Sequence, residues 1–274
     1  MPTILLTNDD GIQSIGLIAL KKKLERFGEV LVVAPNDERS GVGKALTTEE
    51  IEITETKLTD GSRAYATTGT PADAFLLATN KIMRHPPDLL MAGINLGPNL
   101  GIDDLLNSGT LGAALEAAIH KVPAIAVSYC IEKITEQQVE KQRVTIEELE
   151  LPAALAAKAA KYVLEYGMPK GVDIISINVP EEAEPSEIEV TTISYKGYGD
   201  IHSVWKGLPS ERTEQQKTYK IISWSLSDYP DDRPGTDLHA VKERRHISIT
   251  PIKVSLPHKK RRLEDLRKFL LNTE

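Results

Sequence analysis

The chain has 274 residues, of which 41% are hydrophobic and 27% charged, and a formal net charge of −7. These values are ordinary for a globular protein, and they exclude a general electrostatic attraction to nucleic acid or to anionic lipid. The sequence has no apolar run of about eighteen residues and no basic-then-apolar leader, and its one cysteine is Cys130, so we predict a cytoplasmic protein with no membrane span.

Strand and helix patterns alternate along the first two thirds of the chain. In order, the sequence predicts a strand at 3–7, a helix at 15–27, a strand at 30–34, a helix at 72–83, a strand at 88–94, a helix at 108–120, a strand at 123–129, a helix at 151–166 and a strand at 172–179. Strands that are apolar on both faces and alternate with helices indicate a parallel sheet covered on both sides. We therefore predict an α/β fold, a three-layer, Rossmann-like and mostly parallel sheet with helices on both faces.

The pattern changes beyond residue 180. Short β-like segments at 188–195, 218–226 and 246–252 are separated by Gly, Pro and Asp. They predict antiparallel hairpins in a smaller C-terminal lobe. We accordingly divide the chain into an α/β catalytic core at 1–185 and an extension at 186–274 that is used in oligomerisation.

Two further segments do not fit the alternation of strands and helices. The stretch 131–150 is strongly charged and is predicted to be an exposed insertion. The tail 258–271 carries apolar residues at helical spacing, and such a stripe must pack on its own body or on another subunit.

Two adjacent aspartates follow the first predicted strand, in "TILLTNDDGIQS". Asp9 and Asp10 repel each other at a poorly solvated strand end, so the pair needs a partner, and a divalent cation is one candidate. The alternative is that one of them caps the following helix. The stretch alone leaves both interpretations open.

More polar residues follow the next predicted strands, in "PNDERSGVGKALT" and "NLGPNLGIDDLLNSGTLGAALEAA". The glycines around Asn95 and Asn99 allow a ligand to approach the backbone closely. The segment 108–110 precedes strong helix formers, so its N–H groups form either a phosphate cradle or an ordinary helix cap. Because strand ends in a parallel sheet share one edge, we expect these groups and the hydroxyl of Ser40 to converge. All-oxygen donors suit Mg²⁺ or Mn²⁺, and together with an anion cradle they indicate phosphoryl chemistry.

Several other catalytic motifs are absent. The segment "GVGK" is not a P-loop, because Glu38 stands where the first glycine is required and Ala45 where Ser or Thr is required. The first turn holds aspartates where a dinucleotide fingerprint needs glycines, and it lacks the Asp-x-Asp of haloacid dehalogenase-like phosphatases. No His/Cys cluster has zinc spacing, and no Gly-x-Ser-x-Gly elbow occurs.

Five segments in order closely resemble the survival protein SurE family of metal-dependent nucleotidases: "TNDDGIQSIGL", "APNDERSGVGKALT", "TTGTPADAFLLA", "AGINLGPNLG" and "SGTLGAALEA". The later "TDLHAVKERRHISITPI" resembles the C-terminal signature of that family. The resemblance implies metal binding by Asp9, Asp10, Ser40 and Asn95. It implies phosphate binding by Asn99, Ser108, Gly109 and Thr110, with Gly41 nearby.

The resemblance also implies an activity and an assembly. It implies hydrolysis of nucleoside monophosphates, with polyphosphate cleavage in some members, and one divalent ion (Mg²⁺ or Mn²⁺) per subunit. It implies homodimers or homotetramers built by exchange of C-terminal segments. No nucleic-acid polymer and no membrane is expected as a partner. Tyr198 and Trp205 are candidates for stacking a nucleobase or for plugging a subunit interface.

We predict attack of metal-activated water on the phosphomonoester, with Asp9 or Asp10 also orienting or deprotonating that water. A phospho-aspartate at Asp9 is the other route. Many family members carry His where this chain has Lys44. If this position contacts the phosphate, the lysine supplies a fixed positive charge where a histidine would supply one that titrates. The rival functions are a nucleotide or phosphate sensor without turnover and a dinucleotide-dependent oxidoreductase.

Overall fold

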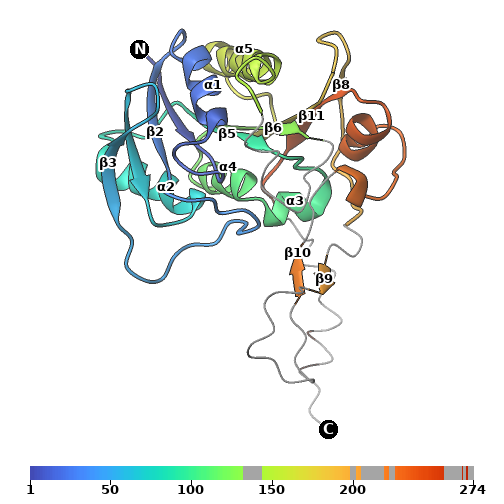
Figure 1. The fold of residues 1–274 in the computed structure, drawn as a ribbon, viewed down its shortest axis with the longest axis horizontal. Coiled ribbons are helices and arrows are strands. Elements are labelled where there is room, and N and C mark those ends of the chain that lie inside the picture. The colour runs from blue at the N-terminus through green and yellow to red at the C-terminus, as the bar shows by residue number, and fades with distance from the viewer. Residues whose placement is uncertain are drawn as a thin grey trace.

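The structure, a computed structural model, describes residues 1–131, 144–197, 202–204, 219–221 and 226–255, with Arg267 and Leu270. Within this part of the chain a sheet lies between two layers of helices (Figure 1). The predicted three-layer α/β fold is therefore confirmed. None of the described helices is long and apolar enough to cross a bilayer.

Nine strands of the described residues form one mixed sheet, in the order β3-β4-β2-β1-β5-β6-β7-β11-β8. Their bounds are β1 Thr3–Thr7, β2 Glu29–Pro35, β3 Ile53–Lys57, β4 Arg63–Thr67, β5 Leu89–Leu96, β6 Ala124–Cys130, β7 Ile174–Pro180, β8 Ile188–Val190 and β11 Ile247–Ile252. The central run from β4 to β7 is parallel, whereas β3 pairs antiparallel with β4 and β11 antiparallel with β7. The carboxyl ends of β1, β5, β6 and β7 therefore lie along one edge.

Among the described residues, two helices cover each face of the sheet (Figure 1). On one face α1 (Ile15–Leu24) and α5 (Glu150–Tyr166) contribute to one large apolar core. On the other, α2 (Pro71–Leu77) and α4 (Gly109–Ile119) contribute to a second core. The remaining helical segments are η1 Ala78–Ile82, α3 Gly101–Asn107, η3 Leu226–Asp228 and η4 His239–Glu243.

Local sequence explains where the helices that flank the strand-end edge begin. The hydroxyl of Ser14 accepts from Gly16 N at the start of α1. Thr70 and Asp73 form a capping box around α2, with Pro71 in its first turn. The predicted helix 72–83 is therefore one helical run, α2 followed by the π-helical turn η1.

The strands predicted at 188–195 and 246–252 were assigned to the wrong sheet. The strands there, β8 and β11, complete the main sheet instead of forming a separate lobe, because β11 pairs with β7 from Ile252 to Ser248. β7 is buried along its whole length, and a buried strand needs hydrogen bonds on both edges. The division at residue 185 stays a prediction.

A second, two-stranded sheet contains one of the predicted C-terminal strands, whereas the smaller lobe itself stays a prediction. This sheet consists of the antiparallel pair β9 (His202–Val204) and β10 (Tyr219–Ile221), and β10 lies in the predicted segment 218–226. Most of the predicted insertion at 131–150, most of the tail 258–271, and Tyr198 and Trp205 lie outside the described residues.

Candidate functional site: a cavity at the strand ends

A small cavity of about 60 Å³ lies at the carboxyl ends of β1 and β5. That volume corresponds to about two water molecules, so it accommodates an ion and part of a phosphate but not a nucleoside. Its lining consists of Asp9, Ser40, Gly41, Asn95, Leu96, Gly97, Pro98, Asn99, Asp104 and Ser108. The six predicted site residues in this lining come from four separate segments of the chain, so the expected convergence at one edge is confirmed.

Asp10, Gly109 and Thr110 do not line this cavity but lie directly behind it. The hydroxyl of Thr110 donates to Oδ1 of Asp9, whose side chain is buried at 4% exposure. The amide of Leu96 donates to Oδ2 of Asp10 at 3.1 Å, which ties the first turn to the end of β5. Neither aspartate caps α1, because Ser14 does so; the helix-cap alternative for the aspartate pair is wrong.

The N-terminus of α4 packs directly against Asp9. A Cβ added at Gly109 would lie 2.8 Å from Cβ of Asp9 and 3.0 Å from its Oδ2, so only glycine permits this approach. Ser108 caps α4, its Oγ accepting from Leu111 N at 3.2 Å, and it also lines the cavity. The cap interpretation of this segment is therefore confirmed, and the phosphate cradle stays a prediction.

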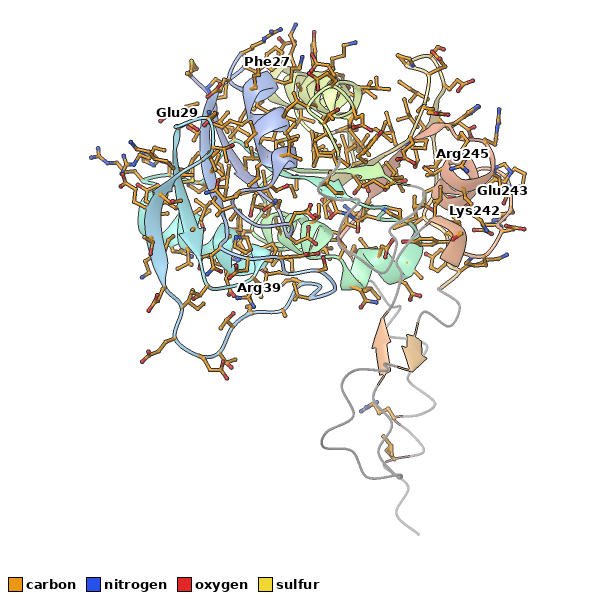
Figure 2. All side chains as sticks on the ribbon, in the orientation of Figure 1. Phe27, Glu29, Arg39, Lys242, Glu243 and Arg245 are labelled. Carbon is orange, nitrogen blue, oxygen red and sulfur yellow. The ribbon has the colours of Figure 1, made fainter. Side chains whose placement is uncertain are left out.

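The loop after β2 is fastened to the first turn through Arg39, labelled in Figure 2. Its backbone N–H donates to Asp9 O at 2.7 Å, and its Nη2 donates to Thr68 O at 2.6 Å. These bonds fix Ser40 and Gly41, the next residues, at the cavity. The hydroxyl of Ser40 donates its proton to Oε1 of Glu38 at 2.7 Å. The lone pairs of the Ser40 oxygen can therefore bind a cation.

The two asparagines of the glycine-rich turn are both held by hydrogen bonds. Nδ2 of Asn95 donates to Gly97 O at 2.9 Å, so the atom with which it would bind a cation is its carbonyl oxygen. Nδ2 of Asn99 donates to Oγ of Ser128 at 2.8 Å. Because a hydroxyl both donates and accepts, Ser128 supports either orientation of this amide, including the one that presents a donor to a phosphate.

Sequence reasoning missed two buried polar residues of this region. Asn178, at the end of β7, accepts from Asn99 N and donates to Asn99 O, both at 3.0 Å. Asp104 lines the cavity and is 3% exposed; burial raises its pKa to about 8. The only signal for Asn178 was an amide in the otherwise apolar run "IISINVP", which matches no motif.

Lys44 does not line the cavity formed by the described residues. Its ammonium pairs with Oε2 of Glu116 on α4, a carboxylate whose side chain is 6% exposed and also lies 3.2 Å from His120 Nε2. The expectation that this position offers a fixed positive charge to phosphate is therefore not supported by the described geometry. The lysine charge instead neutralises a buried carboxylate.

Replacing Lys44 with Ala should therefore lower stability more than activity. The variant leaves the Glu116 carboxylate buried without its ammonium, at a cost of about 1–3 kcal/mol in the free energy of unfolding measured with urea. The double variant Lys44→Ala/Glu116→Gln should recover part of that loss, because it removes the stranded charge. A tenfold rise in KM for a nucleotide in Lys44→Ala would instead show that the lysine reaches substrate.

Comparison with known proteins identifies the family. Residues 4–200 match the family model described as "Survival protein SurE". This chain belongs to the SurE family. The resemblance inferred from the sequence motifs is thereby confirmed, and it extends over the strands and turns that build the cavity.

Curated SurE relatives are similar over most of the chain. The "5'-nucleotidase SurE" of Methanothermobacter thermautotrophicus is 41% identical over 200 residues, 73% of this chain and 75% of the relative. That of Methanothrix thermoacetophila is 39% identical and covers 93% of both chains. Among solved structures, the "Crystal Structure of Sure Protein from Aquifex aeolicus" superposes with a TM-score of 0.72 at 30% identity, over 99% of this chain and 100% of that one.

Proposed function

We propose that this SurE chain is a metal-dependent 5′-nucleotidase, a phosphomonoesterase that hydrolyses nucleoside monophosphates to nucleoside and phosphate. Its relatives named as 5′-nucleotidases support the reaction class. The single observation that carries the proposal is the convergence, in one cavity, of the buried carboxylate of Asp9, neutral oxygen donors and the N-terminus of α4. A sensor without turnover is not favoured, since anion binding alone gives no reason to bury a carboxylate there.

The donor set fits a hard divalent cation. The proposed ligands are two carboxylates, a hydroxyl and an amide oxygen, from Asp9, Asp10, Ser40 and Asn95. The described residues hold no group of three or more His, Cys, Asp or Glu placed to bind a metal, so neutral oxygens must complete the set. Such ligands suit Mg²⁺ or Mn²⁺, and we propose one ion per subunit. When bound, the ion supplies positive charge to the phosphoryl oxygens and lowers the pKa of a nearby water.

The residues of the chain supply the remaining chemistry. Asn99, Ser108 and the first amides of α4 bind the phosphoryl oxygens, and Gly41 keeps that side of the cavity open. Donors aimed at charge that develops in the transition state are worth about 3–4 kcal/mol each. Asp10 is tied to Leu96 N, and we propose that Asp9 or Asp10 also orients or deprotonates the attacking water.

The proposal also covers the assembly of the protein, its location and the position of the nucleoside. We propose a homodimer or homotetramer that exchanges C-terminal segments, and a cytoplasmic location, on the grounds given by the sequence. The tail on which the exchange rests lies mostly outside the described residues. A nucleoside must extend outward from the cavity, because about 60 Å³ leaves it no room inside.

Phosphate release from 5′- and 3′-nucleoside monophosphates, with Mn²⁺, with Mg²⁺ or with EDTA, tests the function. We expect release with either metal, its loss in EDTA and its recovery on adding excess metal. Inorganic polyphosphate in the same assay addresses the second activity. Undiminished release in EDTA would contradict the metal site, and metal binding without release from any nucleotide would favour the sensor.

A further inference from the structure

The turn that carries Asn99 is held by four consecutive backbone amides. The N–H groups of residues 99–102 donate, in order, to Asn178 Oδ1 at 3.0 Å, Asp104 Oδ2 at 2.6 Å, Asp237 Oδ2 at 2.8 Å and Ser194 O at 2.8 Å. Three of the four acceptors come from beyond residue 175, far from the turn in sequence. A tight turn bonded at every amide has little freedom to shift its side chains.

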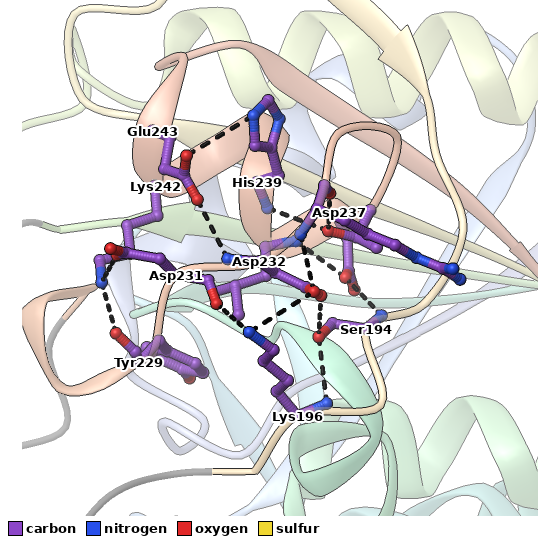
Figure 3. Close-up of polar contacts among 12 residues, drawn as sticks. Ser194, Lys196, Tyr229, Asp231, Asp232, Asp237, His239, Lys242 and Glu243 are labelled. Atoms are coloured by element: carbon purple, nitrogen blue, oxygen red, sulfur yellow. Dashed lines mark hydrogen bonds and ion pairs between the residues drawn. The ribbon is translucent and has the colours of Figure 1, made fainter.

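Tyr229 fixes the second of these acceptors. Its hydroxyl donates to Oδ2 of Asp104 at 2.5 Å, the same oxygen that accepts from Leu100 N. The carbonyl of Tyr229 in turn accepts from Nζ of Lys242 at 2.5 Å, and that ammonium also lies 2.7 Å from Asp231 (Figure 3). A chain of hydrogen bonds therefore runs from η4 to the cavity lining.

Apolar packing holds the turn from the same side. Leu100 is fully buried in a small cluster, separate from the two main cores, with Tyr229, Leu238 and Val241 among its members. Next to it Asp237 accepts from Gly101 N at 2.8 Å. It also accepts from Ser194 N at 2.8 Å (Figure 3). The segments around residue 194 and at 226–241 thus pack against the turn at residues 99–102 and hold it in place.

We propose that Asp104, held by Tyr229, is the positioning residue that sets Asn99 in the phosphate site. This rests on the proposed function, since it assigns Asn99 to phosphate. Asp104 acts through the backbone: it fixes Leu100 N and so the turn from which the Asn99 amide projects. An ordinary helix-capping role for Asp104 would stabilise α3 without affecting phosphate affinity, so the two roles give different results.

The test compares Tyr229→Phe, Asp104→Ala and Asp104→Asn in the full-length, metal-loaded protein. It measures KM and kcat for a nucleoside monophosphate, the Ki of inorganic phosphate, and the Kd of Mn²⁺. We expect KM and Ki to rise about tenfold in Asp104→Ala and about threefold in Tyr229→Phe, with the Kd of Mn²⁺ unchanged. Asp104→Asn keeps an acceptor for Leu100 N, so it should restore most of the phosphate affinity.

The outcomes separate this inference from the proposed function. Tyr166→Phe, on the exposed end of α5, is the matched control and should leave every constant unchanged. If both Asp104→Ala and Tyr229→Phe lower only the unfolding midpoint, the positioning role is wrong and the nucleotidase assignment is untouched. If the unaltered protein neither releases nor binds phosphate, the proposed function fails and this inference fails with it. Should Asp104→Ala not fold, the isosteric Tyr229→Phe decides alone.

Discussion

Replacing Asp9 with Asn should lower kcat/KM for nucleoside monophosphates by about 1,000-fold or more. The side chain is 4% exposed, lies against Gly109 and accepts from the hydroxyl of Thr110, so the variant keeps the shape of the site and loses its charge. Without that charge a divalent cation loses half of its carboxylate partners. The measurement is phosphate release at saturating Mn²⁺, together with the Kd of Mn²⁺ from calorimetry.

A matched control separates charge loss at the site from charge loss in general. Asp60→Asn removes a carboxylate from the exposed turn between β3 and β4 and should leave kcat/KM unchanged. In EDTA the Asp9→Asn protein should unfold at the same temperature as the unaltered protein or higher, because a neutral amide costs less to bury than a carboxylate. Activity retained in Asp9→Asn would mean that the carboxylate serves only to hold Thr110.

The central fold could be predicted because the pattern that builds it is local. Parallel strands buried on both faces must be apolar along their length, and β1 occupies the predicted residues 3–7 while β7 covers most of 172–179. The Ala-rich helix at 151–166 is α5, which begins one residue earlier. In each case the information that specifies the element lies within the element itself.

The edges of the sheet could not be predicted in the same way. β3 and β4 were not predicted, because their residues are mostly polar or partly exposed. They are strands only through the pairing of β4 with β2 and of β3 with β4. β8 and β11 were predicted as strands but assigned to the wrong sheet. Which edge a strand joins depends on what the rest of the fold leaves unpaired, and no local pattern records that.

The site was predictable where its residues sit in turns and not where they act at a distance. Asp9, Ser40 and Asn95 each follow a predicted strand, so a shared edge brings them together. Asp104 and Tyr229 lie 125 residues apart, and no motif in the sequence links them. Their contact depends on the path of the chain after β8, which short-range spacing does not encode.

The pH dependence of stability gives the second large effect, and it arises at Asp104. Burial is the main cause that raises the pKa of this carboxyl from 3.8 to about 8, with the hydrogen bonds from Tyr229 and Leu100 opposing it. The folded protein therefore keeps a proton there that the unfolded chain releases above pH 4 or so. Since the native state binds more protons, the free energy of unfolding falls as pH rises from about 4 to about 8 and is level above that.

Asp104→Asn should remove this fall, because an amide is neutral in both states and retains the acceptor. Between pH 5 and pH 8 the difference between the two proteins should change by about 4 kcal/mol, with the variant the more stable at pH 8. Urea unfolding in EDTA at pH 5 and at pH 8 measures it, and Asp237, whose pKa burial also raises, adds to the pH dependence of both proteins. Parallel pH profiles would mean that Asp104 is ionised in the fold. The cavity would then carry an additional negative charge, and phosphate binding would depend more heavily on the cation.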